Sequence, residues 1–275
     1  LTRYLFGFAD ETQKARWLPL LAAGETTVAV AISEPGVGAH PKHLTTRATR
    51  TDGGWRIDGR KAYVTNGPGA GLFAVLAVSA EEGGRKRYSV FLVERGTPGL
   101  SFGEGHVGER LLPAGHCGLI LEGCEVAEGA VLGTLHEAYR DIAQPLRDAE
   151  DLLRLGPLVG ALLAQVDMIA ERASPGDEDR EAIGGLLARA AGLRALRRAA
   201  FAAAPGDRQP LLLAVAGIAR DAQRTLDGIR ERTGLGDDPV LSRFAADMEV
   251  ILGIARYVER SRLRGLADVR LGRLD

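Results

Sequence analysis

The apolar residues of the chain follow two different periods, and the change falls near residue 133. Before it, apolar and polar residues mostly alternate in short segments, which predicts β-strands. The expected strands are 26–33, 44–50, 55–59, 62–66, 72–80, 87–94 and 117–126. Between them lie the turn sequences Asp52-Gly53-Gly54, Asp58-Gly59, Asn66-Gly67 and Thr97-Pro98-Gly99. Asn-Gly after a β-branched run is a strong signal for a tight hairpin turn.

Helical spacing of apolar residues dominates the second half of the chain. It predicts helices over 146–173, 180–204, 210–234 and 239–271, joined by short Pro/Gly-containing connections. One earlier helix is expected over 10–22, where Asp10 can cap the first turn. The fold class expected is therefore α+β, an antiparallel β sandwich or barrel-like domain followed by a four-helix bundle.

Composition narrows the classes of function. Charged residues make up 26% of the 275 residues, and 35 Lys and Arg face 36 Asp and Glu, so no electrostatic feature favours a nucleic-acid partner. We expect no membrane span and no signal peptide, and thus a cytoplasmic protein with Cys117 and Cys124 as reduced thiols. His40 and His43 have no nearby third ligand, so we expect no metal site.

Two strand ends carry residues that could hold a ligand. The strand ending at Ser33 runs into Pro35 and Gly36, a turn that bares backbone amides. The strand in "KAYVTNG" (61–67) ends at Thr65, whose hydroxyl could serve a ligand as well as a turn. Taken alone, each is most simply a tight turn.

Together these segments resemble the β domain of the acyl-CoA dehydrogenases. "DETQKARWLPLLAAGETTVAVAISEPGVGAH" (10–40) resembles the stretch that opens that domain, including its "[TS]-E-P-x-x-G-S-D" motif. "DGRKAYVTNGPGAGLFAVLA" (58–77) looks like the family's "x-G-x-K-x-[WF]-[IV]-T-N-G-x-x-A". "FLVERGTPGLSF" (91–102) and "LEGCEVAEGAVLG" (121–133) are similar to its later strands. The markers occur in the family's order over about 130 residues.

The resemblance implies an FAD-dependent flavoprotein that dehydrogenates an acyl thioester at its α,β bond. It implies that Ser33 and Thr65 donate hydrogen bonds to the flavin and that Tyr63 packs near its ring. The full set of expected cofactor-binding residues is Val30, Ile32, Ser33, Gly38, Ala39, Tyr63, Val64 and Thr65. Ala39 replaces the serine of the family motif and removes one donor, at a cost of about 1 kcal/mol.

The α half departs further from the family. Pairing Pro239-Val240 with the family's "[DY]-P-V" places Ile254 where the catalytic carboxylate usually stands, and isoleucine cannot accept a proton. Some branched-chain members carry a glutamate earlier, and "DAEDLLRLGPLVG" (148–160) places Glu150 there. Glu150 is the expected base; a solvated charge near a helix start is its plainer interpretation. Arg172 and the "RERTGLG" segment (230–236) are the remnants of two further motifs.

The expected organisation is a remnant of a helical domain over 1–24, a flavin-binding β domain over 25–133 and a bundle over 134–275. The family's helical domain before the β domain is missing from this sequence, so we expect a partner chain or a further segment to cover the flavin. Expected partners are acyl-CoA or an acyl-carrier thioester, acyl-CoA dehydrogenase-like chains in a homo- or hetero-oligomer, and an electron-acceptor flavoprotein. The alternatives are a degenerate subunit that pairs with an active homologue and a flavin-dependent oxygenase on the same scaffold.

Overall fold

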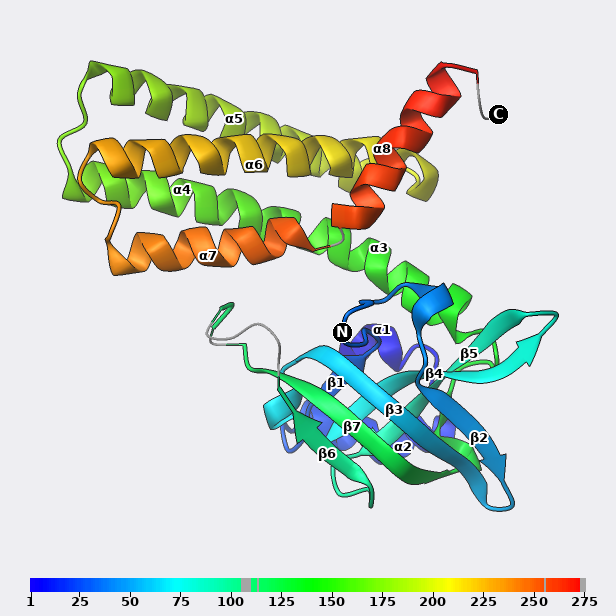
Figure 1. Cartoon of the computed structure of the whole chain (residues 1–275). Helices are drawn as coiled ribbons and strands as arrows, with labels where there is room; N and C mark the ends of the chain where they lie inside the picture. The colour runs from blue at the N-terminus through cyan, green and yellow to red at the C-terminus, as the bar shows by residue number, and fades with distance from the viewer. Residues whose placement is uncertain (105–109, 113, 255, 273–275) are drawn as a thin grey trace. The chain divides into compact units, whose positions relative to one another are not determined.

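The computed structural model describes residues 1–104, 110–112, 114–254 and 256–272. The chain divides into two compact units, Leu1–Arg147 and Asp148–Asp275, which are called the β unit and the α unit below. Strands dominate the first unit and helices the second (Figure 1). The α+β fold class predicted from the two periods is confirmed.

The β unit begins with two helices, α1 (Thr2–Leu5) and α2 (Glu11–Ala22). The predicted Asp10 cap is confirmed: its carboxylate accepts a hydrogen bond from Gln13 N at 2.7 Å, and the Gln13 side chain returns one to Asp10 N. The strands that follow are β1 (Val28–Ala31), β2 (Arg47–Thr51), β3 (Gly54–Thr65), β4 (Leu72–Glu82), β5 (Arg85–Glu94), β6 (Leu100–Gly103), β7 (His116–Ala127) and β8 (Val131–Leu132).

Within the described residues these strands form one sheet in the order β6-β7-β3-β2-β4-β5-β8, and β1 pairs with β4. Most pairings are antiparallel, as predicted, but β4 pairs in parallel with β1 and with the start of β2. The strands β6 and β8 were not predicted, because four- and two-residue segments carry too little pattern.

One turn prediction was wrong, and a second predicted turn is present but does not form the hairpin that its sequence favours. Asp58-Gly59 does not end a strand: β3 runs through it with a register shift against β7, and the Asp58 carboxylate accepts a hydrogen bond from Gly123 N at 2.7 Å. Asn66-Gly67 is a turn but not a hairpin, since β3 pairs with β2 and β7 rather than with β4. Asn66 takes a left-handed conformation (φ 59°) that leads into a 3₁₀ turn, Gly67–Gly69.

The β unit is packed on both faces of β4 and β5. Alternate residues of the apolar run 72–78 point to opposite sides, and all of them are buried. Leu72, Leu76 and Val78 pack with Trp17 of α2 and residues of α1. Phe73 and Val75 pack on the other side with Trp55, Ile57 and the thiol-bearing Cys117 and Cys124, which are free cysteines in the core.

The α unit contains α3 (Gln144–Leu153, which starts in the β unit), α4 (Leu155–Arg172), α5 (Asp177–Ala202), α6 (Arg208–Arg232), α7 (Pro239–Gly253) and α8 (Arg256–Arg270). Helices α4 to α7 run alongside one another around one apolar core (Figure 1). The helix predicted over 146–173 is interrupted at Arg154, because Pro157 cannot continue the backbone hydrogen bonding. The helix predicted over 239–271 is interrupted at Ile254, which follows Gly253.

One helical run, Tyr139–Arg172, is long and apolar enough to cross a membrane by length and composition. The core helix of a soluble bundle meets the same criteria, and Leu158, Leu162 and Val166 of this run are buried in the bundle core. The run is therefore weak support for a membrane span.

Candidate functional site

Two segments that the sequence singled out lie side by side in the β unit. After β1 ends at Ala31, the chain forms a loop over residues 32–40 that lies beside the C-terminal end of β3. Ala62 N donates a hydrogen bond to Ser33 O at 2.9 Å, which joins the two segments directly. We call this loop, together with Tyr63–Thr65, the cradle.

The cradle loop is folded back on itself by a short bridge. Glu34 N donates to Gly38 O at 2.9 Å, and Gly38 N donates to Glu34 O at 3.0 Å. Gly36 and Gly38 both lie in the left-handed region (φ 74° and 59°), where a side chain would be strained. The turn therefore needs these glycines for its shape.

A buried ion pair ties the loop to β3. Lys61 Nζ lies 3.0 Å from Glu34 Oε1 and donates a second hydrogen bond to Ile32 O at 3.0 Å. Glu34 Oε2 accepts from Thr45 N at 2.7 Å and from Thr45 Oγ1 at 2.8 Å, and Thr46 N donates to Oε1 at 2.9 Å. Glu34 and Lys61 are 3% and 1% exposed, so this network fixes both segments from beneath.

The network determines the charge state of both residues. Burial alone would raise the pKa of Glu34, but the Lys61 ammonium and the hydrogen bonds from Thr46 and Thr45 lower it to about 2. Burial lowers the pKa of Lys61 to about 8, with Glu34 acting in the opposite direction. At neutral pH the pair is a buried salt bridge. Glu34 and Lys61 lie in the two segments that resemble the acyl-CoA dehydrogenases, but the sequence analysis assigned them no role. The sequence did contain a signal for a buried ion pair, because each is a charged residue within an apolar segment.

The end of β3 presents an exposed tyrosine in an unusual conformation. Tyr63 has φ 59° and lies in a register shift between Lys61 and Val64 on the β3–β7 pairing. Its side chain is 45% exposed. A left-handed tyrosine is uncommon and costs about 1–2 kcal/mol, which is typical of a side chain positioned for a function.

The other predicted cofactor residues differ in what they can offer. Thr65 is exposed and lies opposite His116 of β7, whereas the Val64 side chain is fully buried in the core and leaves only its backbone for a ligand. Val30 and Ile32 are partly buried and pack against the cluster that contains Trp17. Ser33, Gly38 and Ala39 are partly exposed in the loop.

The cradle has spare hydrogen-bond donors. Within the described part of the chain, the hydroxyls of Ser33 and Thr65 and the amides of Gly36 and Ala39 donate to no other residue. A flavin presents carbonyl oxygens, the ring nitrogens N1 and N5, and a pyrophosphate, all of which accept hydrogen bonds. The donor set therefore fits the expected cofactor.

His40 and His43 stack with ring centroids 4.6 Å apart. Over the residues that the structure describes, no group of three or more His, Cys, Asp or Glu side chains gathers in a way that could hold a metal ion.

In the α unit, Glu150 and Ile254 are both exposed, and Ile254 lies in the break between α7 and α8. Asp151, beside Glu150, is buried and lies 3.1 Å from Arg154 and 3.5 Å from Arg262. Position 254 is an isoleucine and offers no carboxylate.

The two arginines near the remnant motifs are engaged within the α unit. Arg172 Nη1 donates to Asp238 Oδ2 at 2.6 Å, and Asp238 also caps α7. Arg230 is 6% exposed and donates to Gly236 O at 2.9 Å and Ser242 Oγ at 2.8 Å. Both side chains thus brace the connection between α6 and α7.

Comparison with known proteins identifies the domain that carries the cradle. Residues 29–124 match the acyl-CoA dehydrogenase middle domain, and this stretch contains both segments of the cradle. The β unit therefore contains an acyl-CoA dehydrogenase middle domain. An acyl-CoA dehydrogenase of Bacillus subtilis is 33% identical over 132 residues, which is 48% of this chain and 35% of that protein. The mitochondrial isovaleryl-CoA dehydrogenase of Solanum tuberosum is 32% identical over 157 residues, 57% of this chain and 38% of that protein.

The matches to these acyl-CoA dehydrogenases thus span little more than a third of each relative's length. Solved structures extend the likeness to the whole fold. An acyl-CoA dehydrogenase of Geobacillus kaustophilus superposes with a TM-score of 0.82 at 18% identity, covering 98% of this chain and 76% of that one. A glutaryl-CoA dehydrogenase of Mycobacterium smegmatis, solved with FADH2, gives 0.80 at 20% identity over 98% and 72%. The α unit therefore shares the fold of these solved dehydrogenases.

Proposed function

We propose that this chain binds FAD in the cradle and is an acyl-CoA dehydrogenase-like oxidoreductase acting on an acyl thioester by α,β-dehydrogenation. The observation that carries the proposal is the cradle itself. Its spare donors on Ser33, Gly36, Ala39 and Thr65 are held in place by the buried Glu34–Lys61 pair. Relatives that share this β domain are dehydrogenases, which supports the same class of reaction.

The chain's own residues have distinct roles in this proposal. Ser33 and Thr65 orient the ring by hydrogen bonds, and Tyr63 supplies an aromatic surface beside it. The bared amides of Gly36 and Ala39 suit acceptor groups of the cofactor or substrate. Bound FAD would supply the acceptor for a hydride, which no side chain of the chain can provide.

Proton removal from the substrate needs a base, and we propose Glu150 for it. Dehydrogenation takes the α-proton while the β-hydrogen leaves as hydride. Glu150 is the acidic residue that the family motif aligns with a known base position, and its side chain is exposed on α3. The proposal stands on this alignment.

A degenerate subunit that pairs with an active homologue is the second candidate. Two observations favour it: Ile254 replaces the usual carboxylate, and Arg172 and Arg230 are engaged with their own chain. Such a chain would keep the cradle and the fold but not turnover. By analogy with the family, we also propose that the chain forms a homo- or hetero-oligomer and passes electrons to an acceptor flavoprotein. We propose a cytoplasmic location for it.

The visible spectrum of the purified protein tests the function. We expect a flavin spectrum that bleaches anaerobically on addition of acyl-CoAs of varied chain length and branching. Glu150→Gln should retain the flavin and lose bleaching, while Asp148→Asn, an exposed acid on the same helix, should bleach as the wild type does. A protein that takes up no added FAD would refute the enzyme; a yellow protein that never bleaches would favour the degenerate subunit; bleaching without Glu150 would refute the base.

A further inference from the structure

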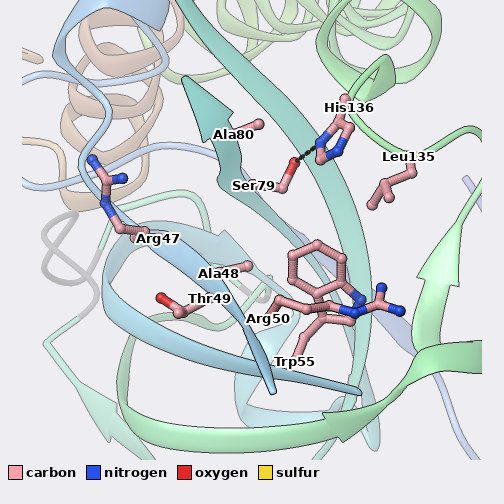
Figure 2. Close-up of a pocket in the computed structure, with 9 residues that line it drawn as sticks. All are labelled: Arg47, Ala48, Thr49, Arg50, Trp55, Ser79, Ala80, Leu135 and His136. Atoms are coloured by element: carbon pink, nitrogen blue, oxygen red, sulfur yellow. Dashed lines mark hydrogen bonds between the residues drawn. The ribbon is translucent and has the colours of Figure 1, made fainter. Parts of the chain in front are cut away.

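A pocket lies at the opposite end of β3 from the cradle. It has a volume of about 460 Å³ and is formed by β2, the start of β3, the end of β4 and the loop before residue 139 (Figure 2). Trp55 of this pocket and Thr65 of the cradle are ten residues apart on β3, which corresponds to roughly 30 Å of strand. The lining residues are Arg47, Ala48, Thr49, Arg50, Trp55, Ser79, Ala80, Leu135 and His136.

The charge of the lining is one-sided, since it includes two arginines and no acid. Each arginine also meets a carboxylate outside the lining: Arg50 lies 2.7 Å from Glu128, and Arg47 lies 3.7 Å from Glu81. A guanidinium has five N–H donors, so one carboxylate leaves several of them available. Arg47 and Arg50 are both more than half exposed, and Arg50 also lies over the Trp55 ring at 5.1 Å.

His136 is held in this pocket at a cost to the backbone. Its φ is 70°, a conformation that histidine adopts at the expense of about 1–2 kcal/mol. The backbone N–H of His136 donates to Ser89 Oγ at 2.8 Å, and the ring nitrogen Nδ1 lies 2.8 Å from Ser79 Oγ. Ser79 Oγ in turn lies 2.7 Å from Ser89 Oγ, and the ring meets Trp55 edge-on at 6.5 Å. An over-determined, strained residue of this kind points to a function.

The hydrogen bonds fix which nitrogen of His136 carries the proton. The Ser89 hydroxyl is fully buried, and its oxygen already accepts a hydrogen bond from the backbone N–H of His136. The Ser89 O–H therefore donates to Ser79 Oγ. Ser79 then donates to His136 Nδ1. The reverse order would leave the buried Ser89 proton without an acceptor among the described residues, at a cost of about 1–3 kcal/mol. The neutral ring therefore carries its proton on Nε2, as a donor.

We propose that this pocket binds an oxyanion group, a phosphate or a carboxylate, through His136 Nε2–H and the guanidinium group of Arg50, which lies on the Trp55 face of β2 whereas Arg47 points away from it (Figure 2). These two donors, both beside the Trp55 ring, and the lack of an acid in the lining match a ligand rich in acceptor oxygens. The site is separate from the cradle, so the proposal does not depend on flavin binding.

Fluorescence of Trp55 can report occupancy. The sequence has two tryptophans, so a Trp17→Phe background leaves Trp55 alone. We expect saturable changes on titration with inorganic phosphate or with acetate, and the stronger of the two identifies the ligand group. His136→Asn should weaken binding about tenfold while keeping the fold, because asparagine tolerates the left-handed backbone. Arg50→Gln should weaken it by a similar factor, and Arg56→Gln, an exposed arginine outside the lining, should change it less than about twofold.

The imidazole tautomer provides a second readout that does not need a ligand. Nitrogen-15 spectra should show the Nε2-protonated form of His136, and Ser79→Ala should lose this preference. The proposal is overturned if neither anion saturates, if chloride at equal ionic strength gives the same change, or if His136→Asn and Arg50→Gln both bind as well as the parent.

Discussion

Lys61 Nζ lies 3.0 Å from Glu34 Oε1 in an ion pair that is almost completely buried, and the same ammonium donates to Ile32 O at the start of the loop. The two residues are 27 positions apart in the sequence and belong to the two motifs that characterise the family here. The pair connects stability and ligand binding, because it lies beneath the cradle.

Removal of one partner should destabilise the β unit strongly. Glu34→Gln or Lys61→Met leaves the other charge buried without compensation, and each should lower the free energy of unfolding by about 3–5 kcal/mol. The double variant should lose less than the sum of the two. Both tryptophans lie in the β unit, so their fluorescence during urea unfolding monitors this unit. The exposed pair Glu11–Lys14 serves as the control, since Glu11→Gln should cost less than about 0.5 kcal/mol. Equal effects at the two pairs would contradict the expected penalty.

Acid should weaken the β unit through Glu34. The folded pKa of Glu34 is about 2 against an ordinary 4.5, so the unfolded chain binds its proton first as the pH falls. The stabilisation is complete above about pH 4.5 and decreases as the pH falls towards 2, by at most about 3 kcal/mol. Other acids titrate in the same range, so the measurement is the difference between wild type and Glu34→Gln. That difference should shrink steadily below pH 4.5; a constant difference would mean that Glu34 is not held ionised.

The turn after β3 leaves no room for a side chain at Gly67. A Cβ there would lie 2.4 Å from Cys117 Sγ and 3.1 Å from Val64 Cγ1, both in the core. Gly67→Ala should therefore cost about 1–3 kcal/mol. Gly69→Ala is the matched control, because its Cβ would meet nothing within 4 Å. Thermal unfolding of the two variants measures the contrast, and Cys117→Gly should relieve part of the Gly67→Ala penalty. Equal melting temperatures for the two alanine variants would show that the turn adapts.

Loss of a cradle hydroxyl should weaken FAD binding, if the proposed function holds. Thr65→Val and Ser33→Ala each remove one donor, which corresponds to about 1 kcal/mol or roughly fivefold in affinity. Thr65→Ser should restore binding, and Thr51→Val on β2, away from the cradle, should leave it unchanged. Titration of apoprotein with FAD, followed by flavin fluorescence and the shape of the visible band, measures these effects. Unaltered affinity in both variants would remove these hydroxyls from the site.

Much of the local structure follows from short stretches of sequence. The helix at 11–22 follows from its own residues: Asp10 and Gln13, one turn apart, cap its start, and polar and apolar residues alternate along it at helical spacing. The buried strand at 72–82 follows from an apolar run too short for a spanning helix. The cradle motifs likewise could be recognised from residues close in sequence, and residues 29–124 match the acyl-CoA dehydrogenase middle domain that these motifs indicated.

Long-range pairing decided the rest. Asp58-Gly59 has the composition of a turn, but β7 offers hydrogen-bond partners on both sides of it, so the strand continues through a bulge. The roles of Glu34 and Lys61 exist only because two segments 27 residues apart bring opposite charges together in a dry interior, where each must be paired. The sequence by itself determined the two periods, the fold class and the resemblance of the β domain; tertiary structure decided which polar residues are buried, paired or left as donors.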